Sequence, residues 1–101
     1  MAEDLLEFIR SCPGLHAAAV PQEGYERVNW RKSVARAPRV RVRRHTCDCK
    51  AVVYELCQAG GLSFIRRLSR SGGKTVITES EWVRVPEAEH LWLKVLMGTA
   101  R

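Results

Sequence analysis

The chain has 101 residues, which is the length of one small domain, and 46% of them are apolar, enough for a hydrophobic core without disulfides. No apolar run approaches the roughly 18 residues that a membrane-spanning helix needs. The acidic N-terminus, with Glu3, Asp4 and Glu7, is unlike an export signal. We therefore expect one domain in the cytoplasm, with no membrane partner.

The net charge of +6 is concentrated in one short stretch. Residues 27–50 hold nine basic residues and one acidic residue, whereas residues 1–26 hold one basic and five acidic residues. Arginine outnumbers lysine 13 to 4, a bias that a GC-rich genome would produce, but codon usage does not select one segment. The clustering predicts a cationic surface built by residues 27–50.

The first predicted element is a short amphipathic helix over residues 2–11, which Pro13-Gly14 would end. Its apolar side chains recur at the spacing of one helix face. They are Leu5, Phe8, Ile9 and Cys12. We expect a loop at residues 21–24 and a short strand at residues 25–30.

The clearest strand pattern lies at residues 39–44, where arginine and valine alternate. One sheet face would carry Val40 and Val42, and the other would carry Arg39, Arg41 and Arg43. We expect the two valines to anchor the strand to the core and the three arginines to face solvent. Residues 45–50 predict a polar connection.

A three-stranded antiparallel meander is predicted for residues 51–82. Two Gly-Gly pairs, at residues 60–61 and 72–73, supply the positive φ that tight hairpin turns need. Pairing outward from both turns places Arg66 opposite Glu55 on one side and Glu79 on the other. Opposite charges across neighbouring strands are favourable, which supports this register.

The last predicted element is an amphipathic helix over residues 86–97, with Pro86 at its first position and Gly98 just past its end. We expect it to pack on the meander, with Trp82 beneath it. Its apolar stripe consists of Ala88, Leu91, Trp92, Val95 and Leu96.

The predicted fold class is α+β, a small antiparallel β-meander with a short N-terminal helix and a C-terminal amphipathic helix packed on the sheet. A single small basic domain would cover residues 1–101. Its parts would be an N-terminal helix and loop (1–24), a basic segment with a strand (25–50), the meander (51–82) and the C-terminal helix (85–98).

The basic stretch is the first candidate site. Arginine binds phosphate in a bidentate manner and stacks on bases, and phosphate neutralisation gives affinity without sequence specificity. The same pattern also fits a solvated edge strand protected against aggregation, or a surface for an acidic protein. The expected nucleic-acid-binding residues are Arg31, Lys32, Arg36, Arg39, Arg41, Arg43 and Arg44.

The cysteines form the second candidate site. His45, Cys47, Cys49 and Cys57 are donors that suit zinc, but Cys-x-Cys is tighter than the usual Cys-x₂₋₄-Cys and no second pair follows. We expect reduced thiols and no cofactor, with zinc at these four residues as the alternative. No nucleophile–base arrangement or phosphate-binding glycine loop stands out, so we expect no enzymatic activity.

A series of short motifs spans the middle of the chain. Trp30-Arg31-Lys32-Ser33 is followed by a Val-Tyr-Glu-Leu-Cys strand (53–57), a Gly-Gly turn, an Ile-Arg-Arg strand (65–67) and Glu81-Trp82. This order resembles the small actinobacterial regulatory proteins of the BldB type. The resemblance leaves out the basic strand, the Cys-x-Cys and the last helix. It implies a non-enzymatic regulator that dimerises and works beside a helix-turn-helix protein, and it assigns no binding residue.

We therefore predict a small basic non-enzymatic regulatory protein that contacts DNA through residues 27–44. One alternative is a protein–protein adaptor, which would form a homodimer or bind a transcription regulator. The other is a zinc-stabilised module.

Overall fold

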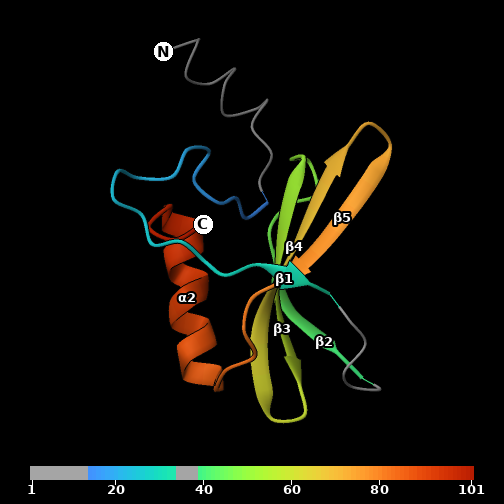
Figure 1. The fold of residues 1–101 in the computed structure, drawn as a ribbon, viewed down its shortest axis with the longest axis vertical. Helices are drawn as coiled ribbons and strands as arrows, with labels where there is room; N and C mark the ends of the chain where they lie inside the picture. The colour runs from blue at the N-terminus through green and yellow to red at the C-terminus, as the bar shows by residue number, and fades with distance from the viewer. Residues whose placement is uncertain (1–13, 34–38) are drawn as a thin grey trace.

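The computed structural model describes residues 14–33 and 39–101. Five strands form one antiparallel sheet in the order β1-β5-β4-β3-β2, and a helix lies against one face of it (Figure 1). The elements are β1 (Arg31–Lys32), β2 (Arg41–His45), β3 (Val52–Ala59), β4 (Leu62–Ser71), β5 (Lys74–Glu79) and α2 (Val85–Met97). The α+β class and the C-terminal helix are confirmed. The helix expected over residues 2–11 lies outside the described residues.

The meander of β3, β4 and β5 has the predicted register. The glycines at 60–61 and 72–73 all have positive φ, between 57° and 80°, as tight turns between twisted strands require. Arg66 pairs with Glu55 on β3 and with Glu79 on β5, and Arg66 Nη1 lies 3.3 Å from Glu55 Oε1. A row of alternating charge therefore crosses the three central strands.

The first strand of the sheet, β1, begins later in the sequence than predicted. Residues 25–30 contribute one isolated bridge, between Glu26 and Ala100, and β1 starts at Arg31. The backbone N–H groups of Glu26 and Val28 donate instead to carbonyls of Thr99 and Arg101, at 2.9 and 3.1 Å. The predicted strand at 25–30 is therefore wrong, because the C-terminal tail takes up its hydrogen bonds.

The opposite edge, β2, does not keep the predicted alternation. Its register against β3 shifts between Val42 and Arg44, so that Arg43 is an extra residue in a β-bulge. Pairing with β3 then places Arg41 and Arg44 on one sheet face and Val42 on the other. All five residues of β2 are exposed, and Val42 retains 43% of its accessible surface. The expectation that Val42 anchors the strand is wrong, because Val42 lies on the outermost strand and on the sheet face opposite to the one that α2 covers.

The hydrophobic core lies between α2 and one sheet face, as predicted. Ala88, Trp92 and Val95 of α2 are buried against a set of sheet residues that includes Tyr54 and Ile65. The helix ends at Gly98, whose φ of 79° suits the left-handed cap and whose N–H donates to Val95 at 3.2 Å.

Trp82 is the exception to the predicted core. Its ring stacks on Phe64 with centroids 4.4 Å apart, and its Nε1 donates to Glu79 Oε1 at 3.0 Å. Phe64 pairs with Cys57, so it lies on the face opposite to that of its neighbour Ile65, which packs against α2. Trp82 therefore covers the far face of the sheet, and its expected place beneath the helix is wrong.

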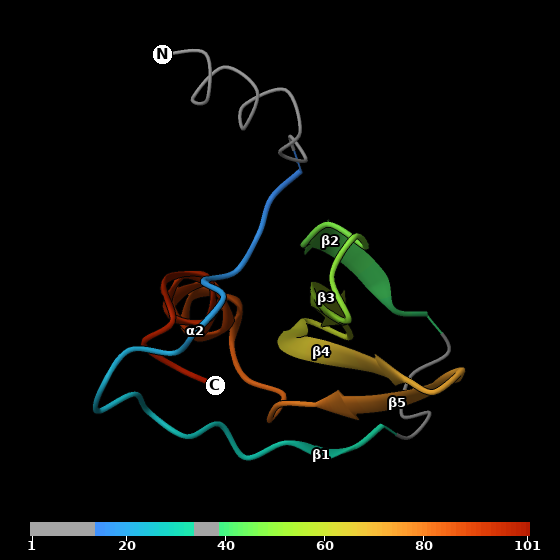
Figure 2. The same ribbon diagram turned by 90° about the horizontal axis from the view of Figure 1, so that it is seen from above.

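The segment before β1 runs beside the C-terminal end of α2 (Figure 2). Backbone N–H groups of Ala18 and Gln22 donate to the carbonyls of Leu96 and Gly98, at 2.8 and 2.7 Å. These bonds fix residues 14–24, which contain neither helix nor strand, against the helix. In the described part of the chain, no helix has both the length and the apolar character needed to cross a membrane.

Candidate functional site

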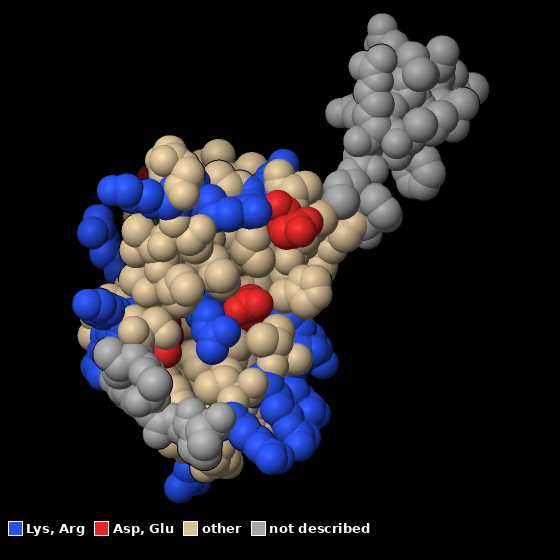
Figure 3. Space-filling view, turned by 90° about the vertical axis from the view of Figure 1, so that its right-hand side faces the viewer, with Lys and Arg blue, Asp and Glu red and all other residues tan. Residues whose placement is uncertain are grey.

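The edge strand β2 carries the densest group of exposed cations. Arg39, Arg41, Arg43 and Arg44 are all exposed. Among residues 14–33 and 39–101, no acidic side chain forms an ion pair with any of these four. On the side of the molecule away from α2, Lys and Arg gather along the rim while acidic side chains are few (Figure 3). We call these four arginines the β2 arginine edge.

A groove of about 320 Å³ lies between this edge and the beginning of α2. Arg43 and Arg44 line it together with the polar side chains of Gln58 and Ser63, and Glu89 stands at its helix side. The bulge brings Arg43 and Arg44 into the same groove, because two consecutive residues of β2 there oppose the single residue Leu56 on β3. The groove thus combines two guanidinium groups with two neutral polar side chains and with the carboxylate of Glu89.

The structure separates the predicted nucleic-acid-binding residues into two groups. Arg31 and Lys32 form β1, at the opposite edge of the five-stranded sheet from β2. Arg31 Nη2 lies 2.8 Å from Glu81 Oε1, so an acid already pairs with its guanidinium. Arg36 lies outside the described residues. Among the described residues of the predicted site, those that lie together are therefore the β2 arginine edge.

Trp30 is the aromatic residue nearest to the basic stretch in the sequence, but it packs inward. It lies against the core cluster, with its ring centroid 6.0 Å from that of Tyr54. The Arg67 guanidinium stacks over the indole at 4.5 Å from its centroid. Tyr54 and Arg67 therefore cover parts of the Trp30 ring that a nucleic-acid base would need for stacking.

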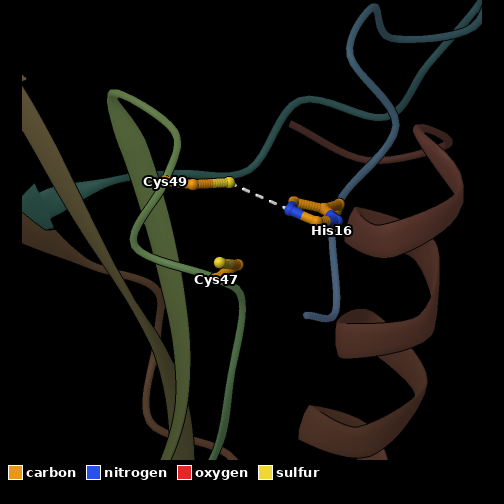
Figure 4. Close-up of side chains that lie close together, drawn as sticks. All are labelled: His16, Cys47 and Cys49. Carbon is orange, nitrogen blue, oxygen red and sulfur yellow. Dashed lines mark hydrogen bonds between the residues drawn. The ribbon is translucent and has the colours of Figure 1, made fainter. Parts of the chain in front are cut away.

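A second cluster joins three side chains that the sequence analysis did not group together. His16, from the segment before β1, meets Cys47 and Cys49, from the loop between β2 and β3 (Figure 4). The imidazole and thiol donor atoms all lie within 4.8 Å of one another, and His16 Nε2 is 3.0 Å from Cys49 Sγ. Of the four residues named as the zinc alternative, Cys47 and Cys49 therefore belong to this cluster.

The other two residues of that alternative lie elsewhere in the fold. Cys57 is completely buried in β3, and this burial raises the pKa of its thiol from 9.0 to about 11. His45 Nδ1 lies 3.0 Å from the carbonyl oxygen of Thr46. His16 was not predicted as a ligand, because it stands 31 positions before Cys47 in the sequence, which is too far for a ligand-spacing motif.

No protein-family model matches this chain, and neither a curated protein nor a solved structure does. The resemblance to BldB-type regulators stays a prediction that rests on residues 30–82 alone.

Proposed function

We propose that this chain is a small, non-enzymatic regulatory protein that acts in the cytoplasm and binds DNA through the β2 arginine edge. Four arginines within six consecutive residues, all exposed and without ion pairs to described acids, carry the proposal. An exposed guanidinium without an acidic partner presents its donors in the planar fork that matches phosphate oxygens.

The geometry of the strand suits a phosphate backbone. Five residues of β2 span about 17 Å at 3.4 Å per residue. One DNA strand presents a phosphate every 3.4 Å along the helix axis, but successive phosphates wind round the duplex, so β2 can lie beside only some of the phosphates within its length. The protein would touch phosphates rather than bases, and it would therefore bind unrelated DNA sequences with similar affinity.

The groove beside Arg43 and Arg44 favours phosphate over an acidic protein surface. The side-chain amide of Gln58 in its lining can donate a hydrogen bond to a small tetrahedral anion, whereas Ser63 donates its hydroxyl to the Cys57 carbonyl at 2.6 Å. An edge strand whose arginines serve only to prevent aggregation would not need a groove beside Arg43 and Arg44. Arg31 and Lys32, at the far edge, would contact a different region of the duplex or none.

The test compares two double variants that remove the same charge. Arg43→Gln with Arg44→Gln should make the log–log salt slope of duplex binding less steep by up to about 1.8, at 0.9 for each phosphate that the protein no longer neutralises. Arg27→Gln with Lys74→Gln removes two exposed cations away from β2 and should leave the slope nearly unchanged. Fluorescence anisotropy with a labelled duplex over a salt series measures both.

Equal reductions of the slope in the two double variants would contradict a localised site. Folded wild-type chain that binds neither DNA nor RNA at low salt would refute the proposal. The protein–protein adaptor would then be the better interpretation of the exposed edge.

A further inference from the structure

His16, Cys47 and Cys49 have the geometry of a metal site, independently of the β2 arginine edge. A tetrahedral zinc ion, with Zn–S of about 2.3 Å and Zn–N of about 2.0–2.1 Å, holds a sulfur and a nitrogen about 3.5 Å apart and two sulfurs about 3.8 Å apart. The observed separations are 3.0 Å between His16 Nε2 and Cys49 Sγ and at most 4.8 Å for the other pairs. The three donor separations thus differ by no more than about 1.3 Å from those of a tetrahedral zinc site.

The loop that carries the two cysteines is fixed by its own hydrogen bonds. Thr46, directly before Cys47, is buried and exchanges hydrogen bonds with Tyr54 of β3: its N–H donates at 2.8 Å and its Oγ1 accepts at 2.9 Å. On the other side, the Arg70 guanidinium donates to the carbonyls of Asp48 and Lys50. The cysteine positions are therefore set by the fold, as a preorganised ligand site needs.

A direct backbone bond brings the histidine segment to this loop. The Cys47 N–H donates to the Leu15 carbonyl at 2.7 Å, one residue before His16. The three donors consequently converge from two chain segments that share no regular secondary structure. Such convergence at the surface is not explained by packing, because Cys49 is exposed and neither cysteine belongs to the core cluster.

We propose that His16, Cys47 and Cys49 bind a structural zinc ion that ties the segment before β1 to the loop between β2 and β3. Two thiolates and a neutral imidazole are donors that zinc prefers. On binding, each of the two thiols loses one proton to solvent, so the Zn²⁺ charge and the two thiolate charges balance. A disulfide between Cys47 and Cys49 would close a strained ring and would leave His16 without a role.

A closed structural zinc site has four ligands, and three are gathered among the described residues. These three are the ligands of the proposed site.

The experiment uses the full chain, expressed in zinc-supplemented medium and purified under reducing conditions without chelator. Elemental analysis should give one zinc per chain. Replacement by Co²⁺ should produce thiolate-to-cobalt charge-transfer bands and the visible ligand-field bands of a tetrahedral site. Competition with a chromogenic chelator should show zinc affinity lowered at least about 10-fold in His16→Asn, Cys47→Ser and Cys49→Ser.

Matched controls are Cys57→Ser and His45→Asn, which change the same residue types outside the cluster and should keep the wild-type stoichiometry and cobalt spectrum. If a ligand variant fails to fold, the cobalt spectrum of the wild-type chain still reports thiolate ligation. Reduced, folded wild-type chain without zinc and without a cobalt thiolate band would overturn the proposal. An equal loss of zinc in Cys57→Ser and Cys49→Ser would overturn it too.

Discussion

Truncation of Trp92 tests how the helix is held to the sheet. The side chain is 1% exposed and is the largest fully buried side chain among residues 14–33 and 39–101. It packs with Tyr54, Leu56 and Ile65, whose positions are fixed by the hydrogen-bonded register of β3 and β4. Because this sheet cannot collapse into the space left by an indole, Trp92→Ala should lower the free energy of unfolding by about 3–5 kcal/mol. That is a large share of the roughly 5–15 kcal/mol that a typical domain has.

Urea unfolding followed by circular dichroism measures this change, with the same buffer and metal content for every variant. Leu93→Ala is the matched control, because its side chain is the next one along the helix and is 54% exposed. It should change the free energy of unfolding by no more than about 0.5 kcal/mol. A decrease below about 1 kcal/mol in Trp92→Ala, or similar decreases in both variants, would refute the packing described above.

Three further substitutions test separate parts of the fold. Arg66→Ala removes the partner of Glu55 and Glu79 and should lower the free energy of unfolding by about 0.4–2 kcal/mol, because each of the two cross-strand pairs contributes roughly 0.2–1 kcal/mol. The affinity for DNA should stay unchanged. Weaker DNA binding at unchanged stability would contradict this prediction. Burial raises the pKa of the Cys57 thiol from 9.0 to about 11, so the folded chain holds this proton more tightly than the unfolded chain. The stabilisation that comes from this proton is fully present below pH 9 and is lost as the pH rises to about 11. Urea unfolding at a series of pH values should therefore show the free energy of unfolding falling more steeply for wild type than for Cys57→Ala across this range. Gly98→Ala places a side chain at a φ of 79° and brings its Cβ within 3.1 Å of Ala18, in the segment before β1. We expect the free energy of unfolding to fall by at least about 1–2 kcal/mol. Unchanged stability would argue against this tight approach.

The meander could be predicted because its determinants are local. Each Gly-Gly pair fixes a two-residue turn, and the turn fixes the register of the strands beside it. The opposite charges around Arg66 then support that register within one short stretch of sequence. The C-terminal helix is similar, since Pro86, Gly98 and the apolar spacing between them all lie within one element.

The edges of the sheet and the cysteine–histidine cluster depend on contacts that local patterns do not encode. The bulge at Arg43 arises from pairing with a strand that begins after a six-residue connection, and the alternation of Arg and Val gives no sign of it. His16 reaches Cys49 because residues 14–24 bond to the end of α2, far later in the chain. His16 stands 31 positions before Cys47, and this separation offers no reason to group the histidine with the Cys-x-Cys.

The most direct test of the proposed function is to map the DNA-binding surface. Titration of the ¹⁵N-labelled chain with a short duplex at low salt should shift the backbone amides of residues 39–45 and of Ser63 in the adjoining groove. The amides of the exposed face of α2, around Leu93, should stay in place. Shifts confined to that helix face or to the β1 edge, or no shifts at all, would contradict the assignment of DNA binding to the β2 arginine edge.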